Sequence, residues 1–340
     1  MNATSGSLSL TYKQVGEETA PLAFRIATPA EFWGRAVRPA WVLIVIATII
    51  LLAGTVLGPF SYAPLHITIA RLSIVGSFAL GVALFRANDR QRSALMMEAF
   101  ALSMAIGLTV PGITSMIAAL NVPYQDANLL ALDRALGLDW NAIVLALRNH
   151  QTPSLILSYC YSSLLWQPVF LFPILAYVDP ERLRRILAAS AIALFVTVII
   201  FIFVPAKTGY VHLGYERSDF PNIHVNTSWG VFEILEDIRR GSRQLSLEGL
   251  VTFPSYHACA AVLLAYGWWA LPILRYPFVI LNVVMFVACV PIGSHYIVDV
   301  LAGFFLALTT FFVADRYFEK TDPHPPLAPW LASPQHRSDI

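Results

Sequence analysis

Eight apolar stretches with the length of membrane helices dominate this 340-residue chain. They lie at about 40–58, 65–85, 95–120, 153–178, 185–205, 254–273, 276–293 and 296–316. A hydrocarbon layer roughly 30 Å thick is crossed by about 20 apolar residues in a helix. Charged residues make up 13% of the sequence, whereas a soluble domain carries about 25%. The sequence therefore predicts an all-α, polytopic membrane helix bundle of about eight transmembrane helices.

Basic residues predict the orientation of these spans. Arg35 and Arg38 precede the first span, and Arg316 and Lys320 end the last. The loops after the second, fourth and sixth spans carry further arginines: Arg86, Arg90, Arg92, Arg182, Arg184, Arg185 and Arg275. On an eight-span path all of these residues fall on one side of the membrane, which the positive-inside rule makes the cytoplasmic side. We expect a multi-pass protein of the plasma or inner membrane with both termini in the cytoplasm.

The charge balance and the cysteines argue against several other classes of protein. The formal net charge is +1, which gives no reason to expect a nucleic-acid partner. The three cysteines lie inside apolar stretches and lack the spacing of metal ligands: Cys160, Cys259 and Cys289. We interpret them as small buried hydrophobic residues.

Two polar motifs flank an apolar run near the end of the chain. The first is Phe253-Pro254-Ser255-Tyr256-His257, and the second is Gly293-Ser294-His295-Tyr296-Ile297-Val298-Asp299. The 38 positions from His257 to His295 correspond to about 57 Å of helix. That length is close to two crossings of a roughly 30 Å layer. The spacing predicts that both histidines lie at the same, outward face of the membrane.

The residue types in these motifs indicate acid–base and nucleophilic chemistry. His295 and Asp299 are four residues apart at the start of a helix, so their side chains share one face. A carboxylate in an apolar helix is costly and is usually paired. Pairing with one imidazole nitrogen fixes the tautomer and raises the basicity of the other nitrogen. One histidine can then attack phosphorus while His257 protonates the departing alkoxide.

The start of the first motif predicts a phosphate site. Pro254 suits the first turn of a helix, and Ser255 with the free amides beside it forms an anion site. Basic residues from the preceding outer segment can neutralise the remaining phosphoryl charge. This chemistry requires neither a metal nor another cofactor.

Two other functions are compatible with the same residues. A metal-dependent membrane hydrolase would bind zinc through the two histidines and Asp299, but one ring is already paired and no fourth ligand is evident. A membrane transporter would use the same residues as a proton relay. It would also show an inverted repeat and broken helices near the bilayer midplane, and the sequence shows neither.

The two motifs resemble those of a known family. Pro254-Ser255-Tyr256-His257 is similar to the P-S-x-H motif, and His295-Tyr296-Ile297-Val298-Asp299 to the H-x-x-x-D motif, of the type 2 phosphatidic acid phosphatase superfamily. The second motif, with its tyrosine, most resembles that of the inositol phosphorylceramide synthase branch, which is inositolphosphotransferase-like. The resemblance implies that His295 forms a phosphohistidine, Asp299 orients it, His257 is the acid and then the base, and Ser255 contacts phosphate.

The chain departs from the common family patterns at the cationic positions. The Ser-Arg pair expected before the second histidine is replaced by Ala288 and Cys289, and Lys207 has no Arg-Pro seven residues later. The phosphate-binding cations are therefore expected elsewhere. Arg239 and Arg243, shortly before the catalytic helix, are the first candidates, and Lys207 is the next.

The resemblance also implies how the chain is organised. We expect a cytoplasmic segment (1–38), two accessory transmembrane helices (39–94), a six-helix phosphatase-type core (95–318) and a Pro-rich cytoplasmic tail (319–340). Within the core, residues 131–140 predict a short amphipathic helix ended by Gly137 that lies on the interface, with Trp140 as its anchor. The expected function is a metal-independent lipid phosphatase or phosphotransferase that acts on a phospholipid or lipid phosphate at the outer leaflet.

Overall fold

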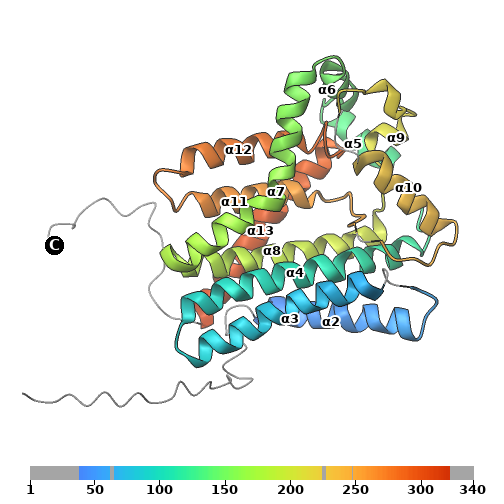
Figure 1. Ribbon diagram of the computed structural model, residues 1–340. Helices are drawn as coiled ribbons and strands as arrows, with labels where there is room; N and C mark the ends of the chain where they lie inside the picture. The colour runs from blue at the N-terminus through green and yellow to red at the C-terminus, as the bar shows by residue number, and fades with distance from the viewer. Residues whose placement is uncertain (1–37, 62–64, 224–226, 247, 322–340) are drawn as a thin grey trace, which may run out of the picture.

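Each apolar stretch of the sequence forms one helix. The computed structural model describes residues 38–61, 65–223, 227–246 and 248–321 (Figure 1). The eight helices are α2 (Arg38–Val56), α3 (Leu65–Ala87), α4 (Gln91–Ala118), α7 (Gln151–Val178), α8 (Pro180–Phe203), α11 (Tyr256–Trp268), α12 (Arg275–Ala288) and α13 (Ile297–Thr321). Within the described ranges, α2, α4, α7, α8 and α13 contain segments long and apolar enough to cross a membrane. The predicted all-α membrane helix bundle is thus confirmed.

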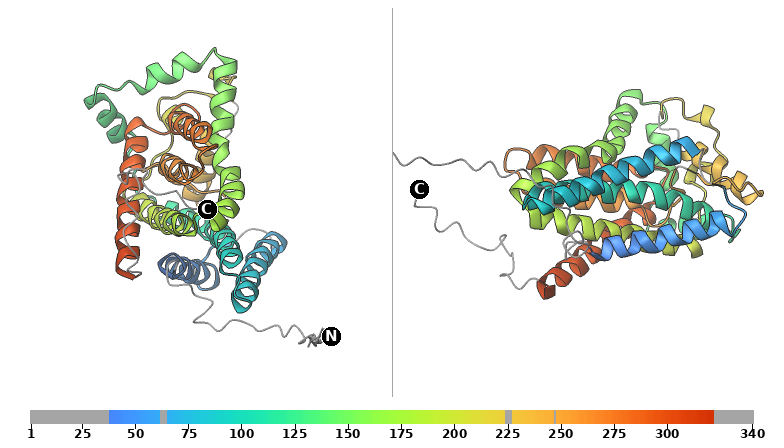
Figure 2. Two further views of the ribbon diagram at one scale, coloured as in Figure 1. Left: turned by 90° about the vertical axis from the view of Figure 1, so that its left-hand side faces the viewer. Right: turned by 60° about the horizontal axis from the view of Figure 1, so that its bottom comes forward.

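The terminal segments predicted from the sequence lie almost wholly outside the described residues, which begin at Arg38 and end at Thr321. The division of the chain into accessory helices and a six-helix core stays a prediction. Figure 2 shows α2 and α3 at one edge of the bundle, where both pack against α4.

The two helices that follow the first motif are shorter than the spacing predicted. Helix α11 has 13 residues and α12 has 14, or about 20 Å each, so neither crosses a roughly 30 Å layer as helix alone. The intervening turn also comes earlier than predicted, because α12 begins at Arg275. Pro277 is accommodated in the first turn of α12, where an N–H group has no helical partner to lose.

The bundle has two distinct ends. In Figure 1 the turns α3–α4, α7–α8 and α11–α12 lie at one end, together with the start of α2 and the end of α13. The opposite end carries short helices from the two long outer segments. These helices are α5 (Asp126–Ala135), α6 (Trp140–Leu147), α9 (Gly209–His212) and α10 (Thr227–Arg239). Both ends of the described chain therefore share one end of the bundle, as the predicted even number of crossings requires.

Helix α7 changes direction along its length. Its first half runs across the bundle and its second half runs along it (Figure 1). Pro168 and Pro173 lie inside this helix, and each removes one backbone hydrogen bond and crowds the preceding turn. The two prolines thus allow α7 to contact both α11 and α12.

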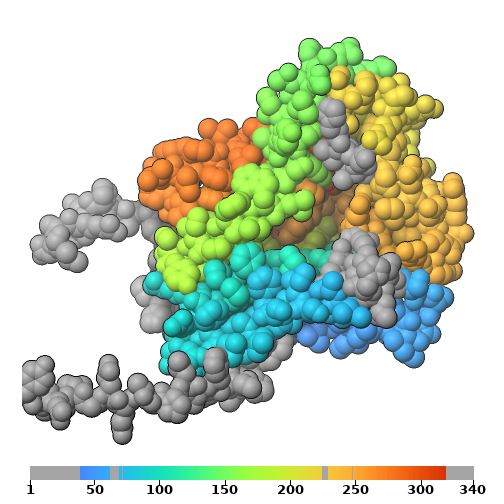
Figure 3. Space-filling view, in the orientation of Figure 1, coloured from blue at the N-terminus to red at the C-terminus, as the bar shows by residue number. Residues whose placement is uncertain are grey.

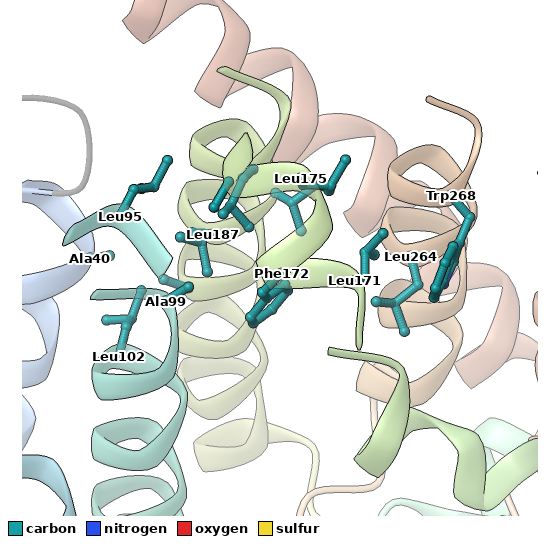
Figure 4. Packing of buried hydrophobic residues seen from close by; sticks show 14 of the residues in the cluster. Ala40, Leu95, Ala99, Leu102, Leu171, Phe172, Leu175, Leu187, Leu264 and Trp268 are labelled. Atoms are coloured by element: carbon teal, nitrogen blue, oxygen red, sulfur yellow. The ribbon is translucent and has the colours of Figure 1, made fainter. Parts of the chain in front are cut away.

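A hydrophobic core joins α7 to its neighbours. Leu171 and Leu175 of α7 pack with Leu187 of α8 and with Leu264 and Trp268 of α11 (Figure 4). All five side chains are buried. This packing holds α11, the helix that carries the first motif, against the middle of the bundle.

A buried polar network sits beside this core. Gln167 of α7 accepts a hydrogen bond from Trp268 Nε1 at 2.8 Å and one from Asn282 Nδ2 at 2.9 Å. The Gln167 amide donates to Ser163 Oγ at 2.8 Å. Side-chain hydrogen bonds of this kind join helices where hydrocarbon offers no polar partner.

Replacing Gln167 by alanine is expected to lower the free energy of unfolding by about 1–3 kcal/mol, because it leaves the buried Trp268 N–H without its partner. Thermal unfolding of the detergent-solubilised protein measures the change. Leu165→Ala is a suitable control, since Leu165 lies in the same helix and is 80% exposed. Equal stability of the two variants would contradict the assigned role of the network.

Candidate active site

The first motif starts helix α11 and is joined directly to the second. Ser255 is the N-cap residue, and its hydroxyl accepts a hydrogen bond from the Ala258 amide at 3.3 Å. Its own backbone N–H donates to the Asp299 carbonyl oxygen at 3.0 Å. A Cβ atom at Gly303 would overlap the Ser255 carbonyl oxygen. Glycine at 303 therefore permits the close approach of α13 to the start of α11.

The second motif is a tight loop between α12 and α13. The His295 amide donates to the Cys289 carbonyl at 3.1 Å, and the Gly293 amide donates to the Ala288 carbonyl at 3.2 Å. A Cβ atom at Gly293 would lie 2.7 Å from the Cys289 oxygen, so only glycine fits there. Ser294 adopts a positive φ of 60°, a conformation that costs free energy for a residue other than glycine.

His295 and Asp299 form the predicted pair. His295 Nδ1 lies 3.5 Å from Asp299 Oδ2, and both side chains are buried. This distance is longer than an ordinary hydrogen bond, and the same oxygen accepts the Tyr296 amide at 3.0 Å. His295 Nδ1 and Asp299 Oδ1 have no hydrogen-bond partner within the described structure. A small shift of the ring toward the carboxylate would satisfy Nδ1.

His257 lies in the first turn of α11 and packs on helix α7. Its ring stacks on Tyr161, with 4.1 Å between ring centroids and 9° between ring planes. The Tyr161 ring also lies against the second motif, since a Cβ atom at Gly293 would be 2.8 Å from it. The structure therefore brings Ser255, His257, His295 and Asp299 into one site.

A hollow beside this site is lined by apolar side chains. Figure 3 shows the face of the molecule hollowed between α7 and α4. A cavity of about 140 Å³ lies among α4, α7, α8 and α11, with Tyr256, the neighbour of His257, in its wall.

Two of the three predicted cations gather around one tyrosine. Arg239 Cζ lies 3.9 Å and Lys207 Nζ 5.0 Å from the centroid of the Tyr124 ring, which are cation–π distances. The Tyr124 hydroxyl donates to Glu236 at 2.6 Å. Burial and this carboxylate raise the pKa of Tyr124, so its hydroxyl stays protonated and the ring stays neutral.

Of these cations, Lys207 has the most direct link to the histidine motif. Its backbone amide donates to both carboxylate oxygens of Asp126 at 3.0 Å. Asp126 also accepts the hydroxyl of Tyr296, the residue after His295, at 2.8 Å. In the part of the chain that the structure describes, no such link is seen for Arg243, which is exposed and lies 5.6 Å from the Phe60 ring centroid.

Asp133, which was not predicted to be a site residue, holds the start of α13. It is fully buried, and its two oxygens accept the amides of Ile297 at 3.0 Å and Val298 at 2.8 Å. A carboxylate satisfies the free N–H groups of a helix start and interacts favourably with the helix dipole. Burial raises the pKa of Asp133, and the two amides oppose that rise.

Trp140 contacts the loop between α12 and α13 that carries His295. The prediction that Trp140 is an anchor at the membrane interface is therefore wrong. The side chain is fully buried, and its Nε1 donates to the His295 carbonyl at 2.8 Å. The ring packs edge-on against Tyr210 at 5.0 Å. Gly209 lies so close that a Cβ atom there would overlap the indole.

One signal in the sequence indicated that Asp133 has partners inside the protein. The buried residues of α5 are Asp126, Leu129, Leu130 and Asp133. Their spacing of three, four and seven residues defines one helical face. Two carboxylates on an otherwise apolar face indicate partners inside the protein, because buried charges need hydrogen bonds.

Replacing Trp140 by phenylalanine keeps much of the ring packing but removes the hydrogen bond to the His295 carbonyl. We expect turnover to fall up to about tenfold, in line with a net hydrogen-bond contribution of about 1 kcal/mol. Steady-state kinetics on a lipid substrate measures the change. Trp166→Phe is the control, since Trp166 lies on α7 and contacts Phe170 and Phe278. Turnover at the wild-type level in Trp140→Phe would show that the bond does not position His295.

No curated protein and no solved structure matches the chain. A family model described as the PAP2 superfamily matches residues 127–313. The matched range includes Ser255, His257, His295 and Asp299. It also includes Asp133 and Trp140, which bind the backbone around His295. Since the match spans more than half of the 340 residues and contains the assembled histidine site, this chain belongs to the PAP2 superfamily.

Proposed function

We propose that the protein is a membrane enzyme that removes or transfers a phosphoryl-linked group on a phospholipid or lipid phosphate through a phosphohistidine intermediate. Membership of the PAP2 superfamily supports a lipid phosphatase-type function. The observation that carries the proposal is the contact between the two motifs, in which Ser255 N–H binds the Asp299 carbonyl and Tyr161 packs against both His257 and Gly293. The apolar cavity beside Tyr256 offers room for part of an acyl chain.

The proposed mechanism assigns one role to each side chain. Asp299 lies on the Nδ1 side of His295, so Nε2 is the nitrogen left to attack phosphorus. As the P–N bond forms, the P–O bond to the leaving group breaks, and His257 donates a proton to the departing oxygen. His257 then removes a proton from water or an alcohol, which attacks phosphorus and releases His295.

Phosphate binding is proposed for the start of α11 and for nearby cations. The amides of the first turn and Ser255 face the phosphate oxygens as at other helix N-termini. Lys207 is the cation best tied to the site, through Asp126 and Tyr296. Arg239 joins it across the Tyr124 ring, and Arg243 contributes only if its exposed side chain turns toward the substrate.

The inositolphosphotransferase-like branch is the proposed placement within the superfamily. The tyrosine after His295 matches that branch, and Ala288 and Cys289 stand where the common phosphatases carry Ser-Arg. Tyr296 has a physical role in this chain, because its hydroxyl binds Asp126. The active site is proposed to face outward, at the end of the bundle opposite the basic turns.

Intact-lipid mass spectrometry tests the proposal. Purified protein is given phosphatidic acid, phosphatidylglycerol, phosphatidylinositol, phosphatidylethanolamine and phosphatidylcholine, with and without a lipid alcohol. Loss of the head group or phosphate to water, absent in His295→Ala, identifies a phosphatase. A new acceptor-linked phospholipid, absent in the same variant, identifies a transferase. Equal turnover by both proteins would overturn the phosphohistidine mechanism.

A chelator separates this mechanism from a metal-dependent hydrolase. Among the described residues, no group of three or more histidine, cysteine or acidic side chains is arranged to hold a metal ion. We expect turnover to be unchanged in EDTA, followed by gel filtration into metal-free buffer. Loss of activity that returns on addition of a divalent cation would favour the metal-dependent alternative.

A further inference from the structure

A second cavity lies at the same end of the molecule as the outer helices. Its volume is about 740 Å³, and it is lined by residues of α9, of α10 and of the chain segments on either side of α10. Three aromatic rings contribute to its wall: Tyr215, Trp229 and Phe232. The charged lining residues are Glu216, Arg217, Glu233 and Glu248. None of these residues has a role in the mechanism above.

A chain of aromatic contacts connects this cavity to the loop that carries His295, called here the histidine loop. Trp229 Nε1 donates to the Tyr215 carbonyl at 3.2 Å, and the Trp229 ring lies 5.2 Å from Tyr210. Tyr210 packs on Trp140, whose indole binds the His295 carbonyl. The cavity is therefore separated from the histidine loop by two buried rings, Tyr210 and Trp140.

Phe232 places the cavity next to the proposed phosphate cation. Lys207 Nζ lies 5.5 Å from the centroid of the Phe232 ring, which also lines the cavity. Lys207 is not itself a lining residue, so its positive charge lies behind the Phe232 wall, whereas the carboxylates line the cavity directly. A group that carries both charges, negative near Lys207 and positive inside the cavity, complements this arrangement.

Two of the carboxylates are available to a ligand. Glu216 is engaged within its own turn, where its side chain and that of Asp219 cap each other's backbone amides. Glu233 and Glu248 are exposed, and neither side chain has an ion-pair or hydrogen-bond partner in the described part of the chain. With three carboxylates against one guanidinium, the lining is acidic, so an anionic group is disfavoured.

We infer that this cavity binds the ammonium group of a zwitterionic phospholipid head group, of the ethanolamine or choline class, with the phosphate toward Lys207. Aromatic faces attract ammonium groups, and carboxylates strengthen that attraction where water is partly excluded. This inference rests on the proposed function for the identity of the ligand as a phospholipid. It adds the head group for which the outer segment is built.

Calorimetric titration of the purified His295→Ala protein tests the inference without turnover. The probes are glycerophosphocholine and glycerophosphoethanolamine, with glycerophosphoglycerol as the probe that lacks an ammonium group. We expect the two ammonium probes to bind at least tenfold more tightly than glycerophosphoglycerol. We also expect a Glu233→Gln, Glu248→Gln double variant to lose that difference.

Asp237→Asn provides the matched control, because Asp237 lies on α10, is exposed and does not line the cavity. It removes one carboxylate from the same helix and is expected to leave the preference for ammonium probes unchanged. Equal binding of all three probes, no binding of any probe, or an unchanged preference in the double variant overturns the inference. The proposed function fails separately, if wild type and His295→Ala turn over lipids at the same rate.

Discussion

His295→Ala is expected to lower lipid turnover by roughly 10⁴-fold or more, as removal of a catalytic nucleophile does in other covalent enzymes. The reason lies in the arrangement around the ring. Asp299 sits on the Nδ1 side at 3.5 Å, and Trp140 and Cys289 hold the backbone of His295 through its carbonyl and amide groups. In the variant, water would have to attack phosphorus directly. It would have neither the orientation of the ring nor the lower barriers of a two-step covalent route.

The measurement compares initial rates of lipid turnover with those of two further variants. His257→Ala is expected to lose roughly 10²–10⁴-fold, the usual contribution of a general acid–base group. His150→Ala is the control, because His150 is exposed at the start of α7 and its side chain does not cap that helix. An acid-labile phosphate on the wild-type protein, absent in His295→Ala, would identify the intermediate. A His295→Ala rate close to that of His150→Ala would contradict the mechanism.

The parts of the fold that depend on local pattern were predicted from the sequence. Apolar length alone located the eight helices of the bundle, because crossing a hydrocarbon layer requires a long apolar stretch. The lengths of α11 and α12 were not predicted, since apolar residues continue past both helix ends into the turn at 269–274 and the loop at 289–296. Hydrophobicity does not distinguish a buried loop from a helix.

The candidate site was likewise predicted only in part from the sequence. His295 and Asp299 were paired from their spacing on one helix, and the structure places them together. The partners of Lys207 and Arg239 could not be predicted, because Tyr124 comes from another outer segment. Asp133 escaped notice for a similar reason: its hydrogen bonds to Ile297 and Val298 join residues more than 160 positions apart. Helical periodicity can indicate that such a carboxylate faces the interior of the protein, but it does not identify the residues that the carboxylate binds.

Asp133→Ala is expected to cause the largest loss of turnover among the variants outside the two histidines, roughly 10²-fold, by displacing the start of α13 and with it Asp299 and His295. A misplacement of about 1 Å, produced away from the reacting atoms, is enough for such an effect. The substitution removes the acceptor of two backbone amides. It is also expected to lower the free energy of unfolding by about 1.5–3 kcal/mol, the range for hydrogen bonds to a charged group.

Measurements of stability, kcat and KM together separate positioning of the active site from a general loss of stability. Asp139→Ala is the matched control, since Asp139 caps α6 in the same outer segment through the Ala142 amide and is exposed. It should cost some stability while leaving kcat unchanged. Asp133→Asn retains one acceptor oxygen, so its kcat should lie between those of wild type and Asp133→Ala, with KM nearly constant throughout. If Asp133→Ala and Asp139→Ala lost stability equally and neither changed kcat, Asp133 would serve only to attach α5, and the position of His295 would be set by Trp140 and the loop itself.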